Sequence, residues 1–297
     1  MPGVPSRKRS FVKPEPDLDI SISNVVEEGV QSTTRGTKAG WCLPEGMPHI
    51  LKANGSALAS IYRQEGEPQD IPLFMGVQNC FQSLCKIVTG QAIAGAQALK
   101  VWQKFVETTN ENVKPSKVEN VTPSKVLELA KISVKDCLQK PSALSLAKAQ
   151  CIVLLSEAFS SGDLTESFLI SSSDDEVRKA LKKIKGIGPW SIDIFLMNYL
   201  ERPDVFPIGD LGVRKGIAKL FSLRGNGTKG SLTNSNKKDV EVMERVMEPF
   251  KPYRSIATYY MWKIADSKDA HEDNSKKQKM TRTKPNKADE FMKQESL

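Results

Sequence analysis

The sequence predicts an all-α fold. Between residues 44 and 265, apolar side chains recur at spacings of three and four, which is the period of an amphipathic helix. No segment keeps up the alternation of apolar and polar residues that a half-exposed strand shows. Prolines, glycines and capping residues divide the periodic segments into pieces of helix length. These three observations favour a fold built of short helices.

Composition divides the chain into one domain and two tails. Residues 1–40 are rich in Ser, Pro, Thr and acidic side chains, and residues 267–297 are highly charged. Such segments bury too little apolar surface to fold, so we expect two disordered tails around a domain of residues 41–266. We find no run of 18 or more apolar residues, so we expect no membrane span. We also expect a monomer.

The net charge suits a polyanionic partner. The whole chain carries +8, the two tails account for +1 and +2, and the domain therefore carries +5. A basic domain favours nucleic acid as a partner, although many basic proteins bind none.

The first half of the domain is expected to hold a series of helices and one notable break. The clearest helix has apolar residues from Val77 to Val88 on one face. Gly90-Gln91-Ala92-Ile93 interrupts the chain before the next helix at Ala96. The other helices of this half are expected to begin at Pro48, near Leu58, at Thr122, at Ser142 and near residue 164.

Residues 174–201 predict two helices joined by a tight turn. Ser173 suits the cap of the first helix, and Pro189 suits the first position of the second. Between them lies Lys185-Gly186-Ile187-Gly188. Glycines let backbone N–H groups approach a phosphate closely, at a helix N-terminus whose dipole favours an anion. This candidate helix-hairpin-helix would bind the DNA backbone without reading bases; the alternative is an ordinary helical corner.

Downstream of the hairpin, Asp210 stands 20 residues after Trp190. A helix with Val213 and Ile217 on its buried face is expected to follow it. Residues 222–238 have few apolar side chains and predict a mobile loop. The last helices are expected at residues 239–248 and 252–265.

Three short motifs resemble a known family. They are KGIGPWS at 185–191, DVF at 204–206 and DLGVRKG at 210–216. In this combination they resemble the helix-hairpin-helix superfamily of DNA glycosylases, and within it the alkylation-repair branch, the 3-methyladenine DNA glycosylases of yeasts and bacteria. The resemblance covers about residues 47–266. It implies two helical subdomains with the active-site cleft between them.

The resemblance implies that Asp210 is the catalytic residue. A glycosylase takes the base out of the stack and breaks its bond to the sugar through an oxocarbenium-like transition state. Ordinary glycoside hydrolysis needs a second carboxyl group to protonate the leaving group. An alkylated purine already carries positive charge, so one carboxylate suffices. Asp204 is the competing carboxylate, Asp193 is expected on a helix surface, and a helix N-cap is the alternative role for Asp210.

The resemblance also implies a substrate pocket, since a cationic base prefers electron-rich aromatic faces. Ile194 departs from the family pattern, because the bacterial relative has an aromatic residue there. For each aromatic residue, core packing is the alternative. The expected pocket residues are Trp190, Trp262, Ile194, Leu211 and Tyr260, with Tyr259 as a neighbour.

The gap that an extruded base leaves must be filled by a wedge residue. In the family the wedge follows a glutamine, which Gln91 matches, but the next residue is the small Ala92. Either Ile93 or Gln91 itself then takes the role. The expected DNA-binding residues are thus Gln91, Ala92 and Ile93 at this break, with Lys185, Gly186, Ile187 and Gly188 at the hairpin.

No cofactor is expected, although a cation between the hairpin and a phosphate would be in keeping with the turn. The five cysteines show no ligand spacing, and none follows Cys151, so no iron–sulfur cluster is expected. The stretch after the hairpin lacks the lysine that would form a Schiff base, so base removal without strand cleavage is expected.

The chain is therefore interpreted as a monofunctional DNA glycosylase that removes 3-methyladenine and 7-methylguanine from double-stranded DNA. Arg7-Lys8-Arg9 is a short basic cluster in keeping with a nuclear protein. Two alternatives stay open. One is a non-catalytic helix-hairpin-helix module that binds DNA, and the other is a glycosylase for other damaged bases.

Overall fold

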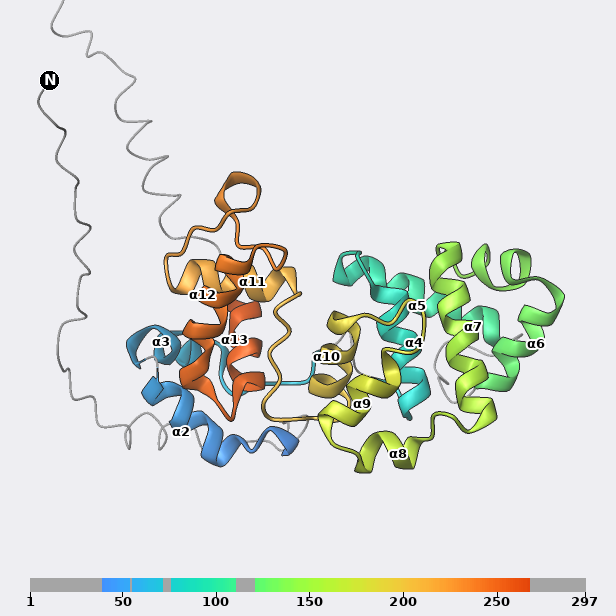
Figure 1. Ribbon diagram of the computed structural model, residues 1–297, viewed down its shortest axis with the longest axis horizontal. Helices are drawn as coiled ribbons and strands as arrows, with labels where there is room; N and C mark the ends of the chain where they lie inside the picture. The colour runs from blue at the N-terminus through green and yellow to red at the C-terminus, as the bar shows by residue number, and fades with distance from the viewer. Residues whose placement is uncertain (1–38, 54, 72–75, 111–120, 268–297) are drawn as a thin grey trace, which may run out of the picture. The chain divides into compact units, whose positions relative to one another are not determined.

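The computed structural model describes residues 39–53, 55–71, 76–110 and 121–267, all of which fall within one unit of the chain. Every regular element among them is helical, so the predicted all-α class is confirmed (Figure 1). None of these helices is both long and apolar enough to cross a membrane. The tails predicted at 1–40 and 267–297 lie outside the described residues, except for Ala39, Gly40 and Ser267.

The elements follow one another in this order. They are η1 Ala39–Trp41, α2 Leu43–Ala53, α3 Gly55–Glu65, α4 Cys80–Gly90, α5 Gly95–Thr109, α6 Pro123–Ser133, the π-helical turn η3 Val134–Gln139, α7 Leu146–Ser161, α8 Glu166–Ser171, α9 Asp174–Leu181, α10 Pro189–Asn198, α11 Leu211–Leu220, the 3₁₀ turn η4 Thr228–Gly230, α12 Lys237–Met247, η5 Glu248–Phe250 and α13 Arg254–Asp266.

Side-chain caps decide where several helices begin, and they correct two predicted starts. Asn79 accepts the backbone N–H of Gln82, so α4 begins at Cys80 and not at Val77. Ser145, not Ser142, caps α7. Pro48 lies inside α2. The predicted cap at Ser173 is confirmed, and it forms a capping box with Glu176.

Helices α4 to α10 pack on one another around a shared core. The pairs α6 and α7, α4 and α5, and α4 and α10 are in contact, and Figure 1 shows these helices together to the right. Helices α4 and α10 are the most enclosed of them, because residues 80–89 and 191–198 are all buried.

Helices α2, α3, α11, α12 and α13 form a second set of contacts, dominated by α11 against α13. At that crossing Gly216 meets the backbone of Met261, where an added Cβ would lie 2.1 Å from the Met261 carbonyl oxygen. The two sets of helices are joined by hydrogen bonds, for example from Trp41 Nε1 to the Met197 carbonyl oxygen, 2.9 Å.

Residues 222–238, predicted as a mobile loop, are tied together by one buried carboxylate. Asp239 accepts hydrogen bonds from the backbone N–H groups of Asn226 and Thr233, both at 2.9 Å. Its partner Asn226 also donates from its side-chain amide, at 2.6 Å. Polar bonds to Asp239 thus organise a segment in which apolar side chains are few.

The helix crossing gives a stability prediction. Gly216→Ala places a Cβ against the backbone of Met261, which cannot rotate away, so we expect the free energy of unfolding to fall by about 1–3 kcal/mol. In a domain of this size the melting temperature should fall by about 2–4 °C for each kcal/mol. Gly95→Ala is the matched control, because no atom lies within 4 Å of its added Cβ. Equal melting temperatures for the two variants would contradict the assigned close crossing.

Candidate active site

The carboxylate of Asp210 is held by three hydrogen bonds from three helices. Its Oδ1 accepts the backbone N–H of Val213, 2.9 Å, so Asp210 is the N-cap of α11. The same oxygen accepts the indole N–H of Trp262 on α13, 2.9 Å. The other oxygen, Oδ2, accepts the indole N–H of Trp190 on α10, 2.7 Å. Asp210 therefore caps α11, as the alternative in the sequence analysis proposed, and the two indole bonds also fix the position of its carboxylate.

The local sequence explains how the two indoles reach one side chain. Pro189 starts α10 and places Trp190 in its first turn. On the other side, a Cβ at Gly212 would lie 2.8 Å from Cδ1 of Trp262, so a residue without a side chain is needed there. The DLG motif thus supplies both the acceptor and the space for the ring that binds it.

This geometry leaves the carboxylate with a defined free position. An ionised carboxylate has about four acceptor positions, two on each oxygen. Oδ1 already accepts two N–H groups and Oδ2 accepts one. No ion pair among the described residues involves Asp210, so its charge is not neutralised by a neighbouring Lys or Arg. The arrangement suits the stabilisation of a positive charge or the orientation of a water through Oδ2.

The two other nearby carboxylates have structural partners. Asp204 forms a bidentate pair with Arg254, with Nε–Oδ1 at 2.6 Å and Nη2–Oδ2 at 2.9 Å. Asp193 was expected on a helix surface, but this was wrong, because its exposed fraction is 6% and it pairs with Arg178. Burial raises the pKa of Asp193, while the guanidinium of Arg178 acts in the opposite direction.

The predicted hairpin lies between α9 and α10. Its Lys185 is exposed, as are the neighbouring Lys182 and Lys183. Gly186 has φ +101°, which favours glycine. A Cβ there would also lie 2.8 Å from Cβ and Sγ of Cys151 on α7.

The two other hairpin residues differ in their surroundings. Ile187 is buried and anchors the turn in the core. Gly188 has an ordinary φ of −101° and open space where a Cβ would lie.

The predicted pocket residues divide into two groups. Trp190 and Trp262 meet at Asp210, and Leu211 beside them is 55% exposed. Ile194 and Tyr260 are each only 1% exposed. The Tyr260 hydroxyl donates to the Gly66 carbonyl oxygen, 2.8 Å. These two side chains therefore lie in the core of the structure and not on an open surface.

The break after α4 contacts the hairpin directly, which the sequence did not indicate. Gln91 Nε2 donates to the Gly186 carbonyl oxygen and to Ser191 Oγ, both at 2.9 Å. Ala92 has φ +56° and is exposed. Ile93 is 38% exposed.

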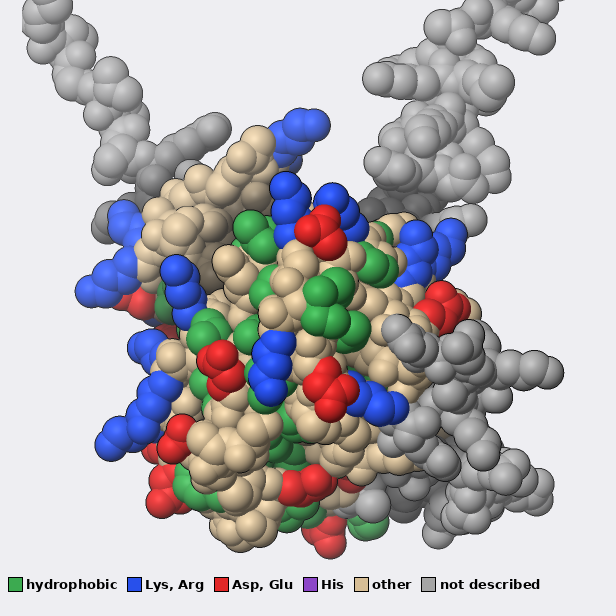
Figure 2. Space-filling model, turned by 90° about the vertical axis from the view of Figure 1, so that its right-hand side faces the viewer, with side chains coloured by type: hydrophobic (Ala, Val, Ile, Leu, Met, Phe, Trp, Pro, Cys, Tyr) green, Lys and Arg blue, Asp and Glu red, His purple; other side chains and the backbone are tan. Residues whose placement is uncertain are grey.

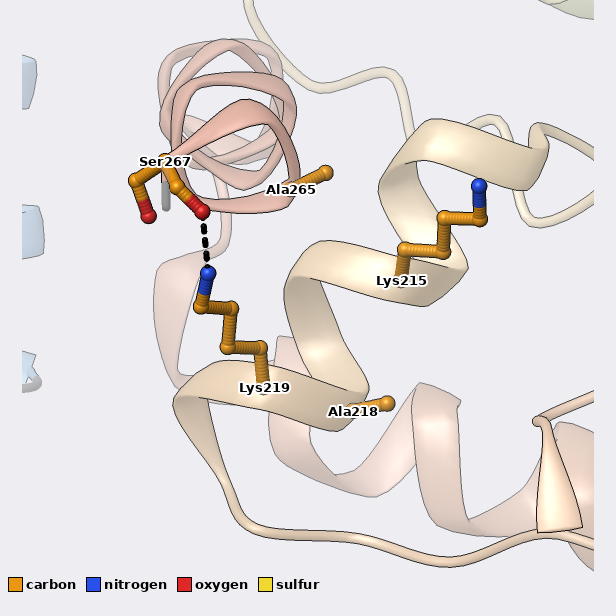
Figure 3. Close-up of a pocket in the computed structure, with 5 residues that line it drawn as sticks. All are labelled: Lys215, Ala218, Lys219, Ala265 and Ser267. Carbon is orange, nitrogen blue, oxygen red and sulfur yellow. Dashed lines mark hydrogen bonds between the residues drawn. The ribbon is translucent and has the colours of Figure 1, made fainter. Parts of the chain in front are cut away.

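A shallow pocket of about 410 Å³ lies on the outer side of α11 and α13 (Figure 3). Lys219 Nζ donates to the Ser267 carbonyl oxygen at its edge. Asp210 does not line it. No group of His, Cys, Asp and Glu among the described residues is arranged to hold a metal ion. The pocket is lined by Lys215, Ala218, Lys219, Ala265 and Ser267.

Comparison with known proteins places this geometry in context. No protein-family model matches the sequence. The chain is 27% identical over 190 residues to the DNA-3-methyladenine glycosylase of Bacillus subtilis, in an alignment that covers 64% of this chain and 58% of that protein. The chain thus spans less than two thirds of that relative.

Two solved structures are similar along most of their length. One is the Schizosaccharomyces pombe 3-methyladenine DNA glycosylase Mag1 in complex with abasic DNA, with a TM-score of 0.58, 22% identity and coverage of 72% of this chain and 94% of that one. The other is the DNA-3-methyladenine glycosidase of Bacillus halodurans, with a TM-score of 0.53, 25% identity and coverage of 75% and 89%.

The chain therefore has the fold of the helix-hairpin-helix DNA glycosylases, as predicted. Within that class it is a homologue of proteins named DNA-3-methyladenine glycosylase, which confirms the resemblance of the three motifs to the alkylation-repair branch.

The hairpin geometry gives a prediction for its two glycines. Gly186→Ala combines an unfavourable φ with a contact on Cys151, and we expect it to lower the free energy of unfolding by about 1–3 kcal/mol. Gly188→Ala meets neither obstacle, so its free energy of unfolding should lie within about 0.5 kcal/mol of the parental value. Thermal melts of both variants provide the measurement, and a larger loss for Gly188→Ala would show that the turn has another conformation.

Proposed function

We propose that this protein is a monofunctional DNA glycosylase. It flips alkylated purines such as 3-methyladenine and 7-methylguanine out of double-stranded DNA and hydrolyses the N-glycosidic bond, which begins base excision repair. The observation that carries the proposal is the Asp210 carboxylate held by the indole N–H groups of Trp190 and Trp262. Homologues named for this activity support it.

The proposed chemistry needs one negative charge close to the sugar. As the bond to the alkylated base lengthens, positive charge develops on the sugar ring, and a fixed carboxylate stabilises it most when water is excluded. Because the three N–H donors already hold Asp210 in place, little reorganisation is needed during the reaction. The leaving base carries its own positive charge, so a second carboxyl group is unnecessary.

The two tryptophans have a second role in the proposal. Their indole N–H groups are directed at Asp210, and their half-buried rings offer electron-rich faces to a cationic base. Leu211 supplies an exposed apolar side chain next to the carboxylate. Ile194 and Tyr260, which the resemblance also assigned to the pocket, are buried in the core.

The proposed DNA contacts lie at the hairpin and at the break after α4. Gly186 and Gly188 offer backbone amides at the N-terminus of α10, whereas the Ile187 N–H is donated to the Ile184 carbonyl oxygen. Lys185 adds exposed positive charge. Of the two wedge candidates, Ile93 fits better, because the Gln91 side chain is bonded to the hairpin. Figure 2 shows basic and acidic side chains mixed on one face, so net charge alone does not mark a DNA surface there.

The proposed product is an abasic site. Trp190 and Ser191 occupy the stretch after the hairpin where a bifunctional relative carries its lysine, so the chain has no amine there for a Schiff base. The same feature disfavours the alternative of a glycosylase for oxidised bases. A non-catalytic DNA-binding module accounts for the hairpin but not for the two indoles on Asp210.

We further propose that the protein is a monomer and acts in the nucleus. The nuclear assignment rests on the Arg7-Lys8-Arg9 cluster, which lies outside the described residues. Size-exclusion chromatography with light scattering tests the first point, and microscopy of a fluorescent fusion with and without the cluster tests the second.

The variant Asp210→Asn distinguishes the proposed enzyme from the alternative of a non-catalytic DNA-binding module. The amide keeps the size of the side chain and an oxygen that can cap α11, but it removes the negative charge. We expect single-turnover release of 3-methyladenine to slow by roughly 100-fold or more. Binding to DNA with an abasic-site mimic should fall much less.

Asp204→Asn is the matched control, since it weakens the pair with Arg254 and lowers the melting temperature while leaving release per folded molecule near the parental rate. Near-parental release by Asp210→Asn would reject Asp210 as the catalytic residue.

A second prediction concerns the hairpin. Gly188→Leu fills the open space beside the backbone amides and should weaken binding to DNA of every sequence by about the same factor. Titrations with two unrelated duplexes provide the measurement, with Gly188→Ala as the smaller control. A variant that binds both duplexes as tightly as the parent would remove the hairpin from the DNA interface.

A further inference from the structure

The chain is fastened to the rest of the molecule where α4 ends, just before the turn that leads to α5. Gln91 Nε2 donates to the Gly186 carbonyl oxygen and to Ser191 Oγ, each at 2.9 Å. Two residues earlier, the Thr89 carbonyl oxygen accepts a hydrogen bond from Lys148 Nζ on α7, 2.9 Å. These bonds link residues that lie 95, 100 and 59 positions apart in the sequence.

The residues that bond to Thr89 and Gln91 lie in the hairpin, in α10 and in α7. Helix α7 carries Lys148 at the turn and Cys151, one helical turn later, against Gly186. Ser191, which accepts from Gln91, is buried and directly follows Trp190, whose indole holds Asp210. A short network therefore joins the turn, the hairpin and the carboxylate.

Beyond these bonds the turn projects outward. Thr89 and Gln91 both precede the exposed Ala92 and Ile93. Ala92 has φ +56°, a conformation that an alanine adopts only where its surroundings impose it. The hydrogen bonds of Gln91 hold the residue directly before it.

We propose that Gln91 and Lys148 are positioning residues. Gln91 fastens the turn of residues 90–94 to the hairpin, and Lys148 fastens the end of α4 before that turn to α7. Together they hold Ile93 so that it enters DNA when the hairpin binds the backbone. This rests on the proposed glycosylase function. Extrusion of a paired base costs a few kcal/mol. A turn that is free to move would be displaced by the DNA and the base would stay stacked. A turn fastened to the phosphate-binding hairpin keeps its position, so that the free energy of DNA binding can offset the cost of extrusion.

The proposal gives Gln91 a role other than that of the wedge. Its side-chain amide is directed back at Gly186 and Ser191, so it does not project with Ile93. Lys148 acts as a cation at the C-terminus of α4, where carbonyl groups lack helical partners. Burial lowers the pKa of Lys148, in keeping with a side chain turned inward.

The test compares excision from DNA in which extrusion is costly with excision from DNA in which it is not. Gln91→Met and Lys148→Met keep side-chain length and remove the donors. From a fully paired duplex, each should release 7-methylguanine about five- to tenfold more slowly, as the loss of one or two hydrogen bonds predicts. From DNA with the same lesion in an unpaired bulge, each should lie within about twofold of the parent.

Three controls separate positioning from a general loss of structure. Lys148→Arg keeps a cationic donor and should recover the paired-duplex rate. Lys125→Met removes a different part-buried lysine, which bonds to Asn110 on the far side of α5, and should leave both rates unchanged. Fluorescence of 2-aminopurine placed beside the lesion reports extrusion directly and should fall for Gln91→Met and Lys148→Met, but not for Lys125→Met.

Each outcome bears on the proposal. Equal slowing on paired and bulged DNA would overturn it, because the residues would then act on chemistry or on folding. Parental rates on both substrates would overturn it as well. If the parent protein releases no base from either substrate, the proposed function fails, while the 2-aminopurine signal still decides whether the two residues govern extrusion. Equal extrusion signals in parent and variants would then reject the positioning role.

Discussion

The structure depends on one carboxylate that accepts hydrogen bonds from two tryptophans on different helices. Trp190 comes from the first turn of α10 and Trp262 from α13, and both donate to Asp210 at the start of α11. This meeting point is possible because α11 and α13 cross closely at Gly216 and because Gly212 leaves space for an indole. The position of the candidate catalytic group is therefore set by how two sets of helices pack.

Asp210 has a structural and a chemical role in the same side chain. Its Oδ1 is used fully, by the cap of α11 and by Trp262, whereas Oδ2 keeps a free acceptor position. A carboxylate held so firmly cannot turn toward a substrate, so the substrate must be brought to it. Under the proposed function, selectivity would then depend on how a base is moved out of the DNA helix and less on the carboxylate itself.

Local signals were enough to predict the all-α class, the hairpin, the cap at Ser173 and the place of Asp210 directly before a helix, because turns and caps are encoded within a few residues. The sequence did not reveal the burial of Asp193 and Ile194, nor the partner of Tyr260, which lies on a distant segment. For Tyr260 the bonded carbonyl group is 194 positions away. The bonds of Gln91 to the hairpin, 95 and 100 positions away, were missed for the same reason. Helical periodicity identifies a buried face but not the neighbour that covers it.

Helix α10 shows why these parts act together. Its N-terminus follows Gly188, its second residue holds Asp210, and its third accepts the amide of Gln91. Residues 191–198 are all buried, so the helix cannot shift without disturbing the surrounding core. The hairpin proposed to bind the DNA backbone, the outward turn and the carboxylate are thus all joined to one rigid helix. Because small displacements of reacting groups reduce rates strongly, a buried helix is the suitable place from which to align all three.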